Sequence, residues 1–179
     1  GMSYRLVDLL RAIHQEGNMT HRVYVAVPVS EAMERFKRGR EKTDDDFLDV
    51  RGIKVFIDGT LGSRGAALID NYADSDHNGF MGRTPKSTLM PILRQALTDG
   101  VQIETHVIGD RAVRSLLDWY DEAFNATPRS EWASSDLRWR LEHAQIIQPD
   151  DQDRFVSLGI LPSMQPSHCT SDMKWLPER

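Results

Sequence analysis

Several features are scarce in this sequence, and each scarcity narrows what the protein can be. Cys169 is its only cysteine, so the chain has no internal disulfide framework, which is typical of a reducing compartment. No apolar run approaches the roughly 20 residues of a membrane span, and the N-terminus has no secretory signal pattern. These absences predict a cytoplasmic protein. Gly1 ahead of Met2 indicates a residue left by expression, with the natural start at Met2.

The sequence also has fewer basic residues than acidic ones. The 22 Lys and Arg residues are outnumbered by 27 Asp and Glu, giving a net charge of -5, whereas nucleic-acid surfaces concentrate basic residues. No G-x-G-x-x-G pattern follows a predicted strand, which disfavours a dinucleotide-binding fold. The length of 179 residues predicts one domain, residues 1–179. We therefore expect neither nucleic acid nor a membrane as a partner.

The apolar periodicity alternates between strand and helix. Strands are predicted at 21–29, 50–57, 101–108, 138–143 and 160–164, and helices at 5–16, 30–38, 87–99, 110–124 and 150–158. Residues 70–85 are rich in Asn, Asp, Gly and Pro, which predicts a long loop. Alternation of this kind predicts parallel strands with right-handed crossovers, as in a doubly wound sheet or part of a (β/α)8 barrel.

Histidines stand near the ends of three predicted strands. His106 and His143 end the third and fourth strands, and His168 follows the fifth. In parallel α/β folds the C-terminal strand ends share one face, and that face carries the site. Neutral imidazoles suit Zn²⁺ or a similar divalent metal. The alternative is that each histidine is a hydrogen-bonded structural residue.

Lys54 is unusual because Ile53 and Val55 flank it within a predicted strand. A buried ammonium is costly, so it must pair, lose its proton or reach solvent. A neutral amine can react with carbon dioxide to form a carbamate, whose oxygens bind metals. The alternative is an ion pair, with Asp58 as the nearest candidate partner in the sequence.

Four segments, in order, carry a family resemblance. They are 54–64 (KVFIDGTLGSR), 105–113 (THVIGDRAV), 140–145 (RLEHAQ) and 164–168 (MQPSH). Together they resemble the amidohydrolase superfamily, in particular the branch that includes N-substituted formamide deformylase-like hydrolases. The likeness runs from about residue 20 to the end of the chain. It implies an α/β fold that is part of a TIM (β/α)8 barrel, with about five parallel strands (family strands 3 to 7) and flanking helices.

The resemblance also implies roles for particular residues. Lys54 matches the often carboxylated lysine of the family's fourth strand, and His106 and His143 match the single histidines of its fifth and sixth, so these three are expected metal ligands. Arg64 and His168 are the candidates for substrate binding. One or two divalent metals, Zn foremost, would activate a water that attacks an amide-like C–N bond of a small molecule.

The departures from the family pattern set further expectations. No His-x-His motif is present, no eighth strand supplies the general-base Asp, and Gly65 stands where the family usually has Thr. We therefore expect an interior fragment that is inactive alone, binds metal weakly or not at all, and has Lys54 uncarboxylated. Open sheet edges would favour a homo-oligomer. The alternatives are a complete small α/β binding or scaffold module, and a mononuclear deaminase of the same superfamily.

Overall fold

The structure is a computed structural model that describes residues 1–179. Its strands are β1 (Val23–Pro28), β2 (Glu41–Lys42), β3 (Leu48–Phe56), β4 (Gln102–Val107), β5 (Arg140–His143) and β6 (Leu161–Ser163). Its α-helices are α1 (Tyr4–Gln15), α2 (Ala32–Arg38), α3 (Lys86–Asp99), α4 (Asp110–Ala126), α5 (Pro149–Leu158) and α6 (Pro166–Asp172). One-turn 3-10 helices lie at Val29–Glu31, Arg129–Glu131 and Leu176–Glu178.

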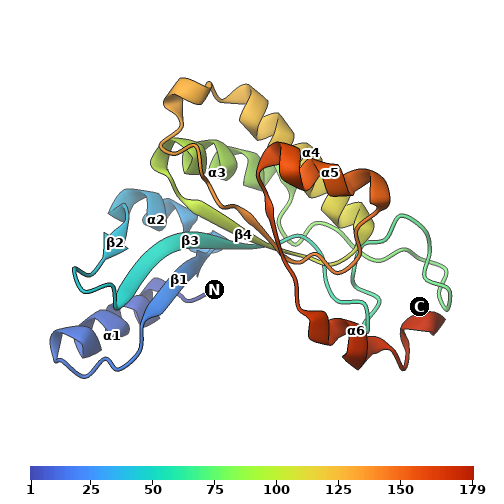
Figure 1. The fold of residues 1–179 in the computed structure, drawn as a ribbon, viewed down its shortest axis with the longest axis horizontal. Coiled ribbons are helices and arrows are strands. Elements are labelled where there is room, and N and C mark those ends of the chain that lie inside the picture. The colour runs from blue at the N-terminus through green and yellow to red at the C-terminus, as the bar shows by residue number, and fades with distance from the viewer.

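The sheet follows the order of the chain. Its strands run β1-β3-β4-β5-β6, every neighbouring pair in this path is parallel, and β2 adds a short antiparallel strand beside β3. Helices α3, α4 and α5 lie together along one side of this sheet (Figure 1). Five consecutive parallel strands with helices between them form part of a (β/α)8 barrel, so the predicted fold is confirmed.

Alternation along the strands separates an apolar face from a polar one. Ile53 and Val55 of β3 and Ile103 of β4 are fully buried in the core, where they join apolar residues of α3 and α4. The residues between them point to the other face, and the register places Lys54 beside Glu104. In a barrel this second face is the interior, so the charged residues on it are the ones available for chemistry.

One strand and one α-helix were not predicted from the sequence. The two-residue strand β2 is too short to show a period. Helix α6 begins at Pro166, a residue favoured in the first turn of a helix, and it includes the exposed Cys169. No helix was predicted around Cys169 from the sequence. None of the helices combines the length and the apolar character that a membrane span needs.

Candidate functional site

Two imidazoles meet at the ends of β4 and β5. The ring centroids of His106 and His143 are 4.7 Å apart, and the rings are edge to face at 70°. The strand register pairs His143 with Val107, whose side chain is buried on the opposite face from that of His106. Simple alternation would therefore separate the rings. His143 instead has a positive φ of 75°, followed by 40° at Ala144, and this turn of the backbone brings its ring to His106.

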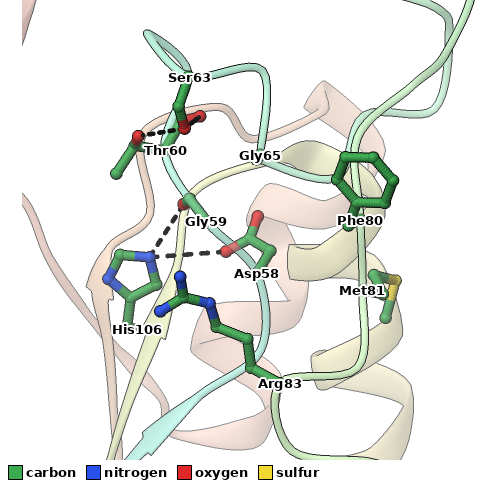
Figure 2. Close-up of a pocket in the computed structure, with 9 residues that line it drawn as sticks. All are labelled: Asp58, Gly59, Thr60, Ser63, Gly65, Phe80, Met81, Arg83 and His106. Atoms are coloured by element: carbon green, nitrogen blue, oxygen red, sulfur yellow. Dashed lines mark hydrogen bonds and ion pairs between the residues drawn. The ribbon is translucent and has the colours of Figure 1, made fainter.

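Each imidazole is held through one ring nitrogen. His106 Nε2 lies 3.0 Å from the carbonyl oxygen of Gly59 and 3.8 Å from a carboxylate oxygen of Asp58 (Figure 2). His143 Nδ1 lies 2.9 Å from the side-chain oxygen of Gln165. Both partners are carbonyl oxygens, which only accept hydrogen bonds, so His106 Nε2 and His143 Nδ1 carry the ring protons. In the neutral rings, Nδ1 of His106 and Nε2 of His143 therefore keep their lone pairs. Metal-ligating histidines are oriented by the same kind of second hydrogen bond.

Burial affects the charge of His106. The residue is 8% exposed, and this desolvation lowers the pKa of its imidazole below the ordinary value. The positive charges of Lys54 and Arg83 act in the same direction, while the hydrogen bond to Gly59 opposes them. The neutral ring is therefore favoured, and this is the form that binds a metal ion.

Lys54 lies on the same face of the sheet, with Phe56 between it and the histidines. Its Nζ is 5.2 Å from the centroid of the Phe56 ring, which is 5.1 Å from the centroid of His106. No carboxylate lies within 4.0 Å of the ammonium. Burial lowers the pKa of Lys54, whereas the charges of Glu142 and Glu104 oppose that shift. A proton is thus easier to remove from Lys54 than from a solvated lysine.

The alternative ion pair between Lys54 and Asp58 is wrong, because Asp58 is fully engaged elsewhere. Its carboxylate accepts hydrogen bonds from the backbone N–H groups of Ala67, Ile108 and Gly109, at 3.0, 3.0 and 2.8 Å. Asp58 thereby ties the loop after β3 to the turn between β4 and α4, beside His106. Sequence inspection missed this role, since the backbone groups that Asp58 binds come from distant segments.

These residues fit part of a metal site. The chain has no group of three or more His, Cys, Asp and Glu side chains arranged to hold a metal ion, and a catalytic zinc usually has three protein ligands. His106 and His143 fit two of those positions, and Lys54 could add a third only as a neutral amine or a carbamate. The assignment of the three residues as metal ligands stays a prediction.

Each imidazole of the pair lines a cavity. The first, of about 310 Å³, is lined by Asp58, Gly59, Thr60, Ser63, Gly65, Phe80, Met81, Arg83 and His106 (Figure 2). The second, also about 310 Å³, is lined by Leu61, His143, Gln145, Ile146, Met164, Gln165, Pro166, His168, Cys169 and Leu176. His143 and His168 stack across the second cavity, with ring centroids 5.6 Å apart.

The two candidates for substrate binding are placed differently. His168 lines the second cavity beside His143. Arg64 lines neither cavity, and its guanidinium donates two hydrogen bonds to Asp74 at 2.8 and 2.5 Å. The basic residue that does face the first cavity is Arg83, which sequence inspection did not single out. The substrate-binding roles of Arg64 and His168 stay predictions.

Known proteins resemble this chain in sequence and in fold. The family model described as "Amidohydrolase family" matches residues 2–179. The chain is 35% identical over 127 residues to the protein LONG AFTER FAR-RED 3 of Arabidopsis thaliana, covering 71% of this chain and 21% of that protein. An uncharacterized metal-dependent hydrolase from Pyrococcus furiosus has a similar structure, with a TM-score of 0.81 and 27% identity over 97% of this chain and 34% of that one.

An uncharacterized metal-dependent hydrolase from Pyrococcus horikoshii OT3 is equally similar, with a TM-score of 0.80 and 27% identity over 97% of this chain and 33% of that one. The chain thus spans about a fifth of the plant protein and about a third of the two archaeal structures. The match of the family model over residues 2–179 shows the affiliation directly. The chain belongs to the amidohydrolase family.

Proposed function

We propose that the protein containing this chain is a metal-dependent hydrolase of non-peptide C–N bonds in small amide-like molecules, related to the N-substituted formamide deformylase-like branch. The observation that carries the proposal is the meeting of His106 and His143, each anchored through one nitrogen. The descriptions of the two archaeal neighbours as metal-dependent hydrolases support it.

In this proposal His106 and His143, with Lys54, contribute to holding one or two divalent metals, with Zn²⁺ foremost. The metal supplies Lewis acidity, which lowers the pKa of a water toward about 7 and polarises the scissile carbonyl. The chain's own residues position the ligands: Gly59 orients the ring of His106, and Gln165 orients that of His143. Because this ligand set is partial, we propose that the isolated chain is inactive.

The test uses the full-length protein with Zn²⁺, a panel of N-substituted formamides and other amides, and the variants His106→Asn and His143→Asn. We expect bound zinc, measured by elemental analysis, and amide hydrolysis to fall together by at least about tenfold in both variants, the lower range for disturbed metal sites. His21→Asn is the control, because His21 is exposed and lies outside both cavities.

The products separate the proposal from the deaminase alternative. Hydrolysis of an N-substituted amide releases an amine and a carboxylic acid, whereas a deaminase releases ammonia. Full retention of zinc and activity in both histidine variants would contradict the proposed site. A protein that binds amides with zinc present but hydrolyses none of them would favour the binding-module alternative.

A further inference from the structure

Arg35 is a buried arginine without a counter-ion. It lies on α2 and is only 2% exposed, and no carboxylate lies within 4.0 Å of its guanidinium. Its single hydrogen bond runs from Nη2 to the carbonyl oxygen of Arg51, at 3.2 Å, and its Nε is buried without a partner. A guanidinium has five N–H donors and stays charged in proteins. A buried charge is costly unless it is paired, so this group needs a negative partner.

The carbonyl group that Arg35 binds belongs to an irregularity of the sheet. The register between β1 and β3 shifts by one residue between Val25 and Ala26, which leaves Arg51 as an extra residue of β3. Arg51 is paired with no residue of β2 or β4 either. A bulge of this kind leaves backbone groups unpaired, and Arg35 donates to one of them. This contact fixes the guanidinium between α2 and the bulge of β3.

A second buried group without a partner lies near Arg35. Tyr4, the first residue of α1, is 5% exposed, and its hydroxyl has no hydrogen-bond partner. Burial raises the pKa of Tyr4, and among the charged side chains Arg35 opposes this rise most strongly. The guanidinium and the hydroxyl are both donors, and no hydrogen bond joins them. One negatively charged acceptor placed between them would satisfy both.

The acidic residues of this region are engaged with other groups. Glu31 accepts a hydrogen bond from the backbone N–H of Tyr4 at 2.7 Å. Burial lowers the pKa of Arg35, and Asp49 is the carboxylate that opposes this shift most. Asp49 nevertheless accepts two hydrogen bonds from Arg40, at 3.3 and 2.8 Å. The side chains around Arg35 therefore supply no free negative charge.

We propose that Arg35 and Tyr4 bind a small monovalent anion of the size of chloride, between α1, α2 and the bulge of β3. The ion accepts hydrogen bonds from Nε of Arg35 and from the hydroxyl of Tyr4, and its charge compensates that of the guanidinium. Both residues are almost completely buried, which excludes a larger ligand. A water molecule in the same place would accept these hydrogen bonds but would leave the charge uncompensated.

Thermal unfolding of the full-length protein tests the ion, with sodium chloride replaced stepwise by sodium isethionate at constant ionic strength. Isethionate is an organic anion too large for a buried site. We expect Tm to rise by about 2 °C or more with chloride and then to saturate. Arg35→Met should abolish this dependence, and Tyr4→Phe should raise the half-saturating chloride concentration by about tenfold. Lys37→Met removes a charge from the exposed side of the same helix and should keep the dependence.

Crystals of the full-length protein grown in sodium bromide locate the ion, because bromide replaces chloride and scatters anomalously. We expect an anomalous peak within hydrogen-bonding distance of both Nε of Arg35 and the hydroxyl oxygen of Tyr4. This measurement uses the unaltered protein, so it tests the site even where Arg35→Met fails to fold.

Three results would overturn the proposal. The first is a parent protein whose Tm does not depend on chloride, and the second is a chloride dependence that Arg35→Met leaves unchanged. The third is a bromide map with no peak at Arg35, where a carboxylate from another part of the full-length protein or a water molecule occupies the position instead. None of these measurements involves zinc or amide hydrolysis, so their failure leaves the proposed hydrolase function untouched.

Discussion

Gly109 and Ala67 approach each other so closely that no side chain fits between them. A Cβ on Gly109 would lie 2.0 Å from the carbonyl oxygen of Ala67 and 2.4 Å from its carbonyl carbon. Both are backbone atoms, so no side-chain rotation relieves the overlap. Gly109→Ala should therefore lower the free energy of unfolding by about 2 to 4 kcal/mol, by overpacking and by disturbing the nearby hydrogen bonds to Asp58. Urea denaturation measures this change.

Gly62→Ala is the matched control. A Cβ on Gly62 would meet only the ring of Trp175, at 3.7 Å, which is an ordinary contact. Its free energy of unfolding should stay within about 0.5 kcal/mol of the parent. Equal stability of the two glycine variants would show that the Ala67 backbone does not press on Gly109.

Asp58 should make a larger contribution to stability than an exposed acidic residue. Asp58→Ala leaves the N–H groups of Ala67, Ile108 and Gly109 without their acceptor, and each buried donor left unpaired costs about 1–3 kcal/mol. We expect a loss of about 3 kcal/mol or more in urea denaturation. Asp118→Asn, which breaks an exposed ion pair with Arg154, should cost less than about 1 kcal/mol. Similar losses would contradict the bridging role of Asp58.

The fold was largely predictable because its signals are local. Runs such as Val101 to Ile108 alternate with amphipathic helices, and five parallel strands follow from that alternation. Strand β2 was not predicted because two residues show no period, and helix α6 was not predicted because it buries no residue and so has no apolar stripe. The irregular segment between β3 and α3 was predicted as a loop at 70–85. Its anchoring by Asp58 could not be predicted, since it depends on the tertiary approach of the loop at Ala67 to the turn at Ile108 and Gly109.

The sequence predicts which histidines belong to the site, but not how their side chains are oriented. Strand-end positions single out His106 and His143, but alternation predicts that their side chains diverge. The positive φ of His143 brings the two rings together, and the residues around His143 give no indication of this backbone turn. Arg83 lies in an irregular segment where no period indicates side-chain direction, which is why Arg64 was considered and Arg83 was not.

The four tyrosines should respond together to alkaline pH. Burial raises the pKa of Tyr4, Tyr72 and Tyr120 above the ordinary value, and raises that of Tyr24 to about 12. In the unfolded chain each ionises near pH 10. The stability that these groups contribute is therefore fully present below pH 10 and is lost as pH rises from 10 through the higher values of the folded state.

A spectrophotometric titration of tyrosinate measures this directly. The native chain should show little ionisation at pH 10, whereas the chain in guanidinium chloride should be about half ionised there. Tyr24→Phe should remove the component near pH 12. Ionisation of native tyrosines with an ordinary midpoint near 10 would contradict the burial that the structure shows.

Self-association is the last prediction, and the structure indicates where it occurs. Strands β1 and β6 each have one neighbour in the sheet. Strand β6 contains Pro162, which has no N–H to donate, so backbone pairing at this edge is poor. Apolar side chains are exposed at this edge instead: Val156 of α5 is 85% exposed, and Leu161 of β6 is 45% exposed. We propose that the chain forms homo-oligomers through this apolar surface.

Sedimentation velocity at micromolar concentration tests the proposal. The double variant Val156→Lys, Leu161→Lys should shift the chain toward monomer, because two ammonium groups would have to be desolvated in the contact. Met33→Lys is the control, since Met33 is 73% exposed on α2, outside the α5–β6 surface. A parent chain that sediments as a monomer would refute self-association. If the oligomer persists in the double variant and is lost in Met33→Lys, the contact lies at the opposite end of the sheet, beside β1.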